Sequence, residues 1–150
     1  MTRISGASIG RKARPQRICL GCGSEVLPPK KECLCGSKST VLFASRAEAR
    51  RYDKLLFLQR VGEIHSLHCH PKFDLNIRDP ETFRMTMARI TKVGVYTADF
   101  SYEINDKKVI EDVKPFKTVK GVRKPLMSEA AAMRIRVFEA LYGLKVVFVE

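Results

Sequence analysis

Two aspartates and a lysine lie in one stretch whose pattern predicts two paired strands. The stretch reads VGVYTADFSYEI, then NDK, then KVIEDVK, and it contains Asp99, Asp112 and Lys114. Side chains two positions apart share one face of a strand, so Asp112 and Lys114 are expected on the same side. Two carboxylates form a hard oxygen site for Mg²⁺ or Mn²⁺, and a neighbouring ammonium can stabilise developing negative charge. These residues therefore predict a metal-dependent active site.

The same residues also have a plainer interpretation. Asp112 and Lys114 could form an ordinary ion pair worth about 0.5 kcal/mol, and Asp99 could simply face solvent. The hairpin favours the active site, because Asn105-Asp106 supplies the turn residues that let the two strands pair. Glu111 is expected on the opposite face of the second strand.

An Asp followed on the next strand by D-x-K resembles the motif of the PD-(D/E)XK nuclease superfamily. The match here is Asp99, then Asp112-Val113-Lys114, with Ala98 where the superfamily's name has proline. The resemblance implies a Mg²⁺-dependent endodeoxyribonuclease that hydrolyses phosphodiester bonds. In that reading Asp99, Asp112 and the Val113 carbonyl hold Mg²⁺ or Mn²⁺, and Lys114 positions water or neutralises charge on the phosphate.

Glu48 is a fourth candidate, on the inward stripe of a helix predicted from Ala44 to about Val61. Ser45-Arg-Ala-Glu48 is also a capping box, in which Glu48 would only satisfy the backbone of the first turn. In the functional interpretation Glu48 adds a third carboxylate to the metal site, as a helix glutamate does in some junction-resolving members of the superfamily. Both interpretations stay open at this point.

The segment SRAEARRYDKLLFLQRVGEI, followed by ADF and EDVK, is similar to a small phage protein family placed in the same superfamily. This resemblance covers residues 44–150. It implies a Holliday junction resolvase-like enzyme that selects branched DNA in phage recombination or replication. It also implies a homodimer, because resolving a junction takes two active sites.

Two close cysteine pairs precede that region, and a glycine directly follows each pair. The pairs read Cys19-Leu-Gly-Cys22 and Cys33-Leu-Cys35. Thiolates at such spacing can bind one tetrahedral ion, and glycine lets the backbone turn beneath it. In a chain expected in a reducing compartment this favours structural Zn²⁺ over disulfides. The alternative is four free thiols.

The charge of the chain predicts a polyanionic partner. Its 28 Lys and Arg against 16 Asp and Glu give a net charge of +12, which is typical of proteins that bind DNA or RNA. One basic group lies in an arm predicted over residues 1–18, and a second lies in a loop predicted over residues 116–124. The candidate DNA contacts are Arg11, Lys12, Arg14 and Arg17 in the arm, and Lys117, Lys120, Arg123 and Lys124 in the loop. The arm could equally be a solubilising tail.

Periodicity predicts the elements that must position these residues. After the helix come a strand over 64–77 bent at Pro71, a surface excursion over 79–92, and the hairpin of 93–104 and 108–114. A helix from Ser128 to about Tyr142 and a strand over 144–149 follow. This is an α/β fold with a mixed sheet and the order αβββαβ, which the resemblance identifies as a restriction-endonuclease-like core. The predicted domains are a basic arm (1–18), a zinc-ribbon-like segment (19–43) and a nuclease-like domain (44–150).

Two other functions remain compatible with the sequence. The zinc ribbon and the basic arm could make a non-catalytic nucleic-acid-binding protein, either a regulator or a ribosome-associated protein. His68, Cys69 and His70 invite a second metal site, but alternation along a strand would keep Cys69 away from the two histidines. The sequence has neither a long apolar span nor a secretory signal, so we expect a cytoplasmic protein, in a bacterial host if phage-encoded. We expect no membrane contact and no small-molecule cofactor.

Overall fold

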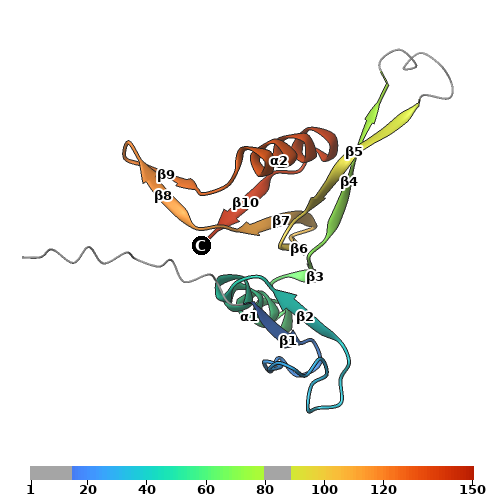
Figure 1. The fold of residues 1–150 in the computed structure, drawn as a ribbon, viewed down its shortest axis with the longest axis vertical. Helices are drawn as coiled ribbons and strands as arrows, with labels where there is room; N and C mark the ends of the chain where they lie inside the picture. Colours follow the sequence, from blue (N-terminus) through green and yellow to red (C-terminus); the bar gives the residue numbers. More distant parts are fainter. Residues whose placement is uncertain (1–14, 80–88) are drawn as a thin grey trace, which may run out of the picture. The chain divides into compact units, whose positions relative to one another are not determined.

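The computed structural model describes residues 15–79 and 89–150. It is a mixed fold with more strands than helices, and the chain divides into two compact units, Met1–Arg50 and Arg51–Glu150 (Figure 1). The division falls inside the first helix, α1 (Arg46–Arg60), whereas the sequence predicts a boundary just before that helix. Among the described residues, neither helix has the length and apolarity needed to cross a bilayer.

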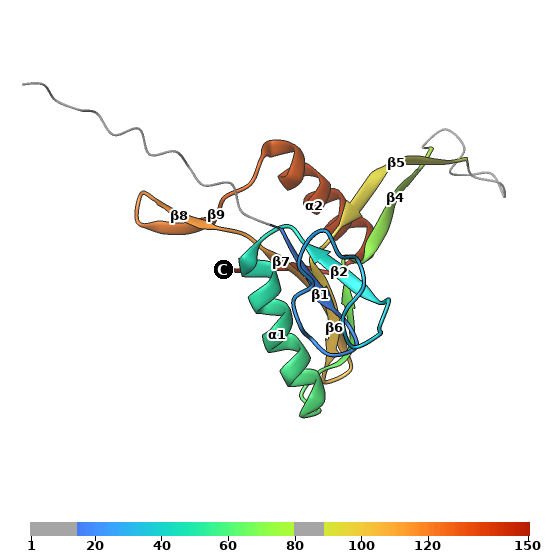
Figure 2. The same ribbon diagram turned by 60° about the horizontal axis from the view of Figure 1, so that its bottom comes forward.

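The first unit is built on a short antiparallel ladder. Its strands β1 (Gln16–Cys19) and β2 (Thr40–Phe43) lie side by side, and the cysteine segment connects them (Figure 2). The start of α1 follows β2 directly. Because β1 begins at Gln16, the predicted arm over 1–18 is wrong at its end: Arg17 lies in a strand and donates to the Thr40 hydroxyl at 3.2 Å.

The second unit contains a four-stranded sheet in the order β10-β7-β6-β3. These strands are β3 (His65–Cys69), β6 (Phe100–Ile104), β7 (Lys107–Val113) and β10 (Val146–Val149). β10 runs parallel to β7, and the other pairs are antiparallel. Asn105 and Asp106 form the predicted two-residue turn, with φ angles of 49° and 60°, between paired Ile104 and Lys107. Along the chain, β3, β6 and β7 of this sheet lie between α1 and the second helix, and β10 follows that helix.

Two predicted long strands are each broken in two. The strand predicted over 64–77 splits into β3 and β4 (Lys72–Arg78), and the strand predicted over 93–104 splits into β5 (Ile90–Thr97) and β6. The breaks face each other: the His70 N–H donates to the Asp99 carbonyl at 2.9 Å, and the Ala98 N–H donates to the Pro71 carbonyl at 3.1 Å. His70 has a φ of 51° and Pro71 has no N–H, so the ladder bends here. Asp99 therefore lies at a corner and not within a strand.

The second helix covers the sheet that carries the acidic residues. α2 (Glu129–Tyr142) begins at the predicted cap Ser128, whose hydroxyl accepts from the Ala131 N–H at 3.2 Å, and it ends at the predicted Gly143 with a φ of 65°. Its buried residues Ile135 and Phe138 pack into one apolar cluster with residues from four strands and the β5–β6 break. The strand members of this cluster are Leu75, Tyr96, Ile110 and Val146, and Ala98 comes from the break.

Three further segments differ from the prediction. The loop predicted over 116–124 is a β-hairpin of β8 (Phe116–Val119) and β9 (Val122–Pro125), because Lys120-Gly121 adopts positive φ angles of 51° and 77° and closes a tight turn. The last strand begins at Val146 and not at 144. The excursion predicted over 79–92 is wrong at its end, where β5 already begins at Ile90, and residues 80–88 lie outside the described residues.

A buried ion pair joins α1 to the sheet within the second unit. The Arg51 guanidinium donates to both oxygens of Glu111, at 2.6 and 2.7 Å, and the Tyr102 hydroxyl donates to the same carboxylate at 3.0 Å. Glu111 is fully buried, and the hydrogen bonds to it raise the pKa of Arg51. As expected, Glu111 points away from Asp112, and its partners show that this face of β7 is structural.

Glu111→Gln should therefore unfold more easily than the wild type. The amide NH₂ cannot accept from Arg51, so a buried guanidinium contact is lost at a cost of about 2–3 kcal/mol. This free-energy cost is smaller than for a fully buried ion pair because the Arg51 side chain is 26% exposed. In a calorimetric scan this should lower Tm by about 5–10 °C. The exposed Glu103→Gln is the control, and an unchanged Tm for Glu111→Gln would show that the pair contributes nothing.

Candidate functional site

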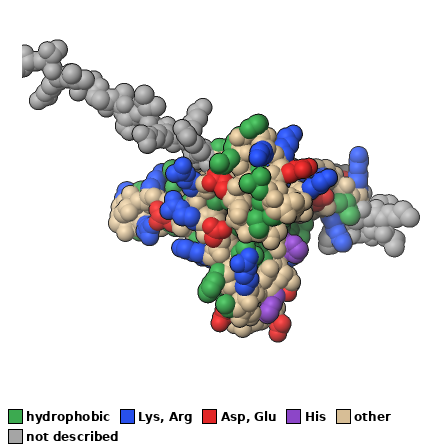
Figure 3. Space-filling view, turned by 90° about the horizontal axis from the view of Figure 1, so that it is seen from below, with side chains coloured by type: hydrophobic (Ala, Val, Ile, Leu, Met, Phe, Trp, Pro, Cys, Tyr) green, Lys and Arg blue, Asp and Glu red, His purple; other side chains and the backbone are tan. Residues whose placement is uncertain are grey.

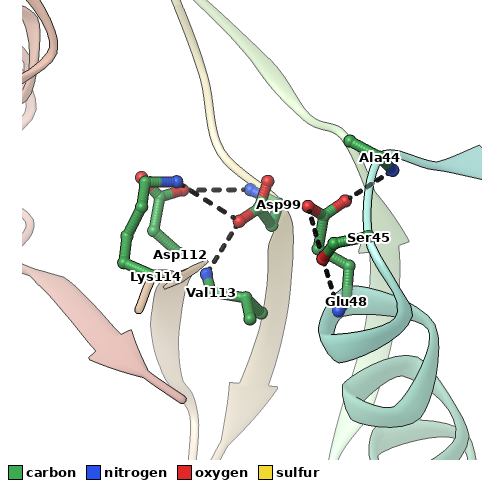
Figure 4. A network of polar contacts seen from close by, with 7 residues as sticks. All are labelled: Ala44, Ser45, Glu48, Asp99, Asp112, Val113 and Lys114. Carbon is green, nitrogen blue, oxygen red and sulfur yellow. Dashed lines mark hydrogen bonds and ion pairs between the residues drawn. The ribbon is translucent and has the colours of Figure 1, made fainter. Parts of the chain in front are cut away.

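The structure brings Asp99, Asp112 and Lys114 together. Asp99 lies in the break between β5 and β6, Asp112 lies near the end of β7, and Lys114 follows that strand directly. The Lys114 ammonium lies 3.4 Å from Asp112 Oδ2 and 3.6 Å from Asp99 Oδ2 (Figure 4). The predicted convergence of the three side chains is therefore present, although Asp99 reaches it from a corner of the ladder.

Each of the two carboxylates accepts a hydrogen bond from the backbone of the neighbouring segment. The Asp99 N–H donates to Asp112 Oδ1 at 3.1 Å, and the Val113 N–H donates to Asp99 Oδ2 at 2.7 Å (Figure 4). Each aspartate thus has one oxygen fixed by a main-chain group of the neighbouring segment. Hydrogen bonds of this kind orient the carboxylates before any ligand arrives. The predicted contribution of the Val113 carbonyl stays a prediction.

The two carboxylates of this acidic pair share the Lys114 ammonium. The exposed fractions of the side chains are 4% for Asp112, 17% for Asp99 and 26% for Lys114. Both carboxylates are thus largely buried, where a negative charge is costly unless a cation pairs with it. The donor set consists of carboxylate oxygens, the ligands that Mg²⁺ and Mn²⁺ take in proteins. The acidic pair therefore fits a divalent cation by its charge and its chemistry.

A tyrosine that the sequence analysis missed faces the acidic pair. Tyr96 is 4% exposed, and its hydroxyl is a buried polar atom without a hydrogen-bond partner in the described part of the chain. Burial raises the pKa of Tyr96 above its ordinary value, and the charge of Asp112, the approach of the hydroxyl to that carboxylate and the charge of Asp99 raise it further. The approach falls short of the geometry of a full hydrogen bond. The one sequence signal for this residue is its place three positions before Asp99 on an apolar strand.

Glu48 belongs to the first unit, and its hydrogen bonds are those of a helix cap. Its N–H donates to the Ser45 hydroxyl at 3.2 Å, and its carboxylate accepts from that hydroxyl at 3.1 Å and from the Ala44 N–H at 3.0 Å (Figure 4). The capping-box interpretation is therefore confirmed. The placement of Glu48 as a third metal ligand stays a prediction.

The basic candidates fall into three groups. Arg11, Lys12 and Arg14 lie outside the described residues, and Arg17 lies in β1. Lys117 and Lys124 are directly opposite each other on the β8–β9 hairpin, with Lys120 in its turn. Arg123 is engaged within the protein, because it pairs with the Glu150 carboxylate and lies 5.2 Å from the Phe116 ring. In the view of Figure 3, Lys and Arg side chains lie at many separate points with acidic and apolar side chains between them.

The four cysteines of the first unit form one cluster. The sulfur atoms of Cys19, Cys22, Cys33 and Cys35 lie within 4.8 Å of one another. The closest pairs are 3.6 Å for Cys19 and Cys35 and 3.4 Å for Cys22 and Cys33. Tetrahedral binding with Zn–S bonds of about 2.3 Å places sulfur atoms about 3.8 Å apart. The predicted turns are also present, since Gly23 and Gly36 have φ angles of 78° and 82°. The cluster could hold a metal ion such as zinc.

The thiols of this cluster differ in acidity. Hydrogen bonds from the side chain and the backbone of Ser24 lower the pKa of Cys22 to about 6. A hydrogen bond from the Cys35 backbone favours the thiolate of Cys33, but the neighbouring thiols of Cys22 and Cys35 oppose it and raise the pKa of Cys33 to about 12. Crowded thiolates repel each other, and a bound cation would relieve that repulsion.

The second metal site at His68, Cys69 and His70 does not form. Burial raises the pKa of the Cys69 thiol to about 11, which disfavours the thiolate that a metal needs. No other cluster of cysteine and histidine side chains occurs in residues 15–79 and 89–150.

Comparison with known proteins gives one match. Residues 37–146 match the model of a family described as "Protein of unknown function (DUF1064)". The chain belongs to the DUF1064 family. No curated protein and no solved structure matches it. The DUF1064 region includes Glu48, the acidic pair and Lys114, but it begins after the four cysteines, which are therefore an addition to the part of the chain that defines the family.

We expect the purified, reduced chain to contain one tightly bound metal ion per molecule. Cys22→Ser should lose that ion, because the hydroxyl is a far poorer ligand for a soft site, while Cys69→Ser is the matched control and should keep it. Elemental analysis of the freshly purified variants measures this. A wild-type chain without metal, or a Cys69→Ser chain that loses it, would contradict the assignment.

Proposed function

We propose that this chain is a metal-dependent DNA endonuclease of the PD-(D/E)XK type, which hydrolyses phosphodiester bonds. The observation that carries the proposal is the convergence of Asp99, Asp112 and Lys114, with each carboxylate fixed by a backbone N–H of the neighbouring segment. Carboxylates oriented in this way, with one ammonium for two negative charges, are what a divalent cation and a phosphate require. An ordinary surface ion pair would need neither the burial nor the backbone bonds.

Asp99 and Asp112, with the Val113 carbonyl, would hold Mg²⁺ or Mn²⁺. When bound, such an ion polarises a scissile phosphate and lowers the pKa of a water molecule. Lys114 contributes a positive charge beside the same oxygens. Its side chain is 26% exposed, so its ammonium can meet a phosphate that approaches from solvent. There it would offset the negative charge that builds up as the phosphodiester is attacked.

The surrounding fold supports the same proposal. Asp112 lies on β7, a central strand of a mixed sheet, Asp99 directly precedes β6, the next central strand, and β10 adds a parallel strand after α2. That order of helix, three strands, helix and strand is the one implied by the resemblance to the nuclease superfamily. From the resemblance also come the choice of branched DNA as substrate, Glu48 as an added ligand, and a homodimer.

The β8–β9 hairpin supports DNA as the substrate. It leaves the sheet immediately after Lys114 and Pro115 (Figure 2). Lys117 and Lys124 are exposed cross-strand partners on this hairpin. Two like charges directly opposite each other destabilise a hairpin, so this pair is unfavourable unless an anion lies between them. A backbone phosphate of DNA would supply that anion, next to the proposed reaction centre.

The four cysteines would hold a structural Zn²⁺. A segment as short as the one between β1 and β2 cannot build its own core, so the ion would supply folding free energy. The cysteine cluster also favours the second candidate function, a non-catalytic nucleic-acid-binding protein that uses the ribbon as a regulator or on the ribosome. That function predicts binding without cleavage.

The proposed active site is tested by cleavage of supercoiled plasmid and of four-way junction DNA with Mg²⁺ or Mn²⁺. Asp99→Asn and Asp112→Asn should abolish cleavage, while DNA binding is kept or improved, because each carboxylate repels phosphate when no cation is bound. Lys114→Ala should also abolish cleavage but leave metal binding largely intact, because an ammonium is not a ligand.

The matched control is Asp106→Asn, the same exchange at an exposed turn where asparagine tolerates the positive φ. It should cleave like the wild type. Glu111→Gln is unsuitable as a control because Glu111 is buried in the Arg51 ion pair. Tight DNA binding by the wild type without any cleavage would favour the non-catalytic function. Full cleavage by Asp112→Asn would show that the site lies elsewhere.

The hairpin is tested through the salt dependence of DNA binding. Each lysine that neutralises a duplex phosphate contributes about 0.9 to the slope of log K against log salt. Lys117→Ala combined with Lys124→Ala should therefore reduce the slope by up to about 1.8. Lys54→Ala combined with Lys107→Ala removes the same charge from two other exposed sites. An equal loss of slope in both double variants would mean that only overall charge matters.

A further inference from the structure

Tyr96 is fixed in the core, and its hydroxyl makes no hydrogen bond of full geometry within the described part of the chain. Its ring centroid lies 4.8 Å from that of Phe138 in α2 and 6.2 Å from that of Phe73 in β4. Packing on two sides fixes the direction of the ring, so the hydroxyl cannot turn to solvent to find a partner. The hydroxyl approaches the Asp112 carboxylate without reaching the geometry of a full hydrogen bond.

A buried hydroxyl without a partner is unfavourable, because folding removes its hydrogen bonds to water and replaces them with nothing. Phenylalanine would fill the same space in the apolar cluster without that cost. Tyr102 on β6 shows the usual solution, since its buried hydroxyl donates to Glu111 at 3.0 Å. The Tyr96 hydroxyl departs from this pattern beside charged groups, which indicates a hydrogen bond that forms fully in another state of the site.

Asp112 is the group that needs a further donor when a cation is bound. Its Oδ1 is held by the Asp99 N–H, and the Lys114 ammonium lies 3.4 Å from its Oδ2. A divalent cation on the acidic pair would repel that ammonium, and the carboxylate would lose part of its support on that side. A phenol is neutral, so it can donate to the carboxylate without opposing the cation.

We propose that Tyr96 is a positioning residue of the acidic site, whose hydroxyl donates to the Asp112 carboxylate once a divalent cation is bound there. The inference rests on the metal site of the proposed function and adds a residue to it. Donors that orient a metal-bound carboxylate typically change metal affinity when they are removed, although they touch neither the ion nor the substrate. Tyr96 should therefore act on cation affinity through Asp112.

The test is Tyr96→Phe in the full chain, with the cysteine cluster saturated with Zn²⁺. The dissociation constant for Mn²⁺, measured by electron paramagnetic resonance of the free ion, should rise by about ten-fold or more. The Tm of the chain without Mn²⁺ should stay equal to the wild-type value or increase, because the variant removes an unsatisfied hydroxyl and keeps the packed ring. A purely structural tyrosine would give the opposite pattern, with lower Tm and unchanged affinity.

Two comparison variants separate the possible failures. Tyr102→Phe removes a hydroxyl that is already satisfied, so it should lower Tm and leave the Mn²⁺ affinity unchanged. Asp112→Asn should lose Mn²⁺ binding. If it does so while Tyr96→Phe binds like the wild type, the inference is overturned and the proposed metal site stands. If the wild type itself binds no Mn²⁺ at this site, the proposed function fails and the inference fails with it.

Discussion

The acidic pair depends on two reciprocal hydrogen bonds between backbone and carboxylate. The Asp99 N–H donates to the Asp112 carboxylate, and the Val113 N–H donates to the Asp99 carboxylate. These bonds require that Asp99 lies at the corner where β5 passes into β6, because there its N–H donates to a side chain and not to the antiparallel ladder. The corner in turn needs the break at His70 and Pro71 on the facing strand. The bend of the ladder and the geometry of the site are therefore the same structural feature.

Local chemistry in the sequence was enough to predict several of these parts. The turn at Asn105-Asp106, the cap at Ser128 and the end of α2 at Gly143 each depend on one or two residues with strong preferences. The common face of Asp112 and Lys114 followed from strand alternation alone. The cysteine cluster was also predictable, because its spacing and its glycines specify the loop geometry locally.

The remaining parts depend on contacts that no local pattern encodes. Arg51 and Glu111 are 60 residues apart, and only the fold shows that they pair. In the sequence Tyr96 is one more residue of an apolar strand. The surroundings of its hydroxyl are set only when packing fixes its ring. The sequence predicts a loop in place of the β8–β9 hairpin, because a lysine in the turn is a weak indicator of a hairpin and four-residue strands carry little periodicity.

The two faces of β7 differ in how their buried carboxylates are paired. On one face Glu111 is fully buried, yet its charge is met by a bidentate guanidinium and a phenol, so that face is complete as it stands. On the other face Asp112 is almost as buried, but it shares one ammonium with Asp99, at distances too long for strong hydrogen bonds. A tyrosine hydroxyl beside it remains unsatisfied. The same strand holds Glu111 with close hydrogen bonds on one side, whereas on the other the acidic pair shares a more distant ammonium and the Tyr96 hydroxyl lacks a hydrogen bond of full geometry. A divalent cation would answer both, by neutralising the charge directly and by drawing Asp112 and Tyr96 into one hydrogen-bonded arrangement.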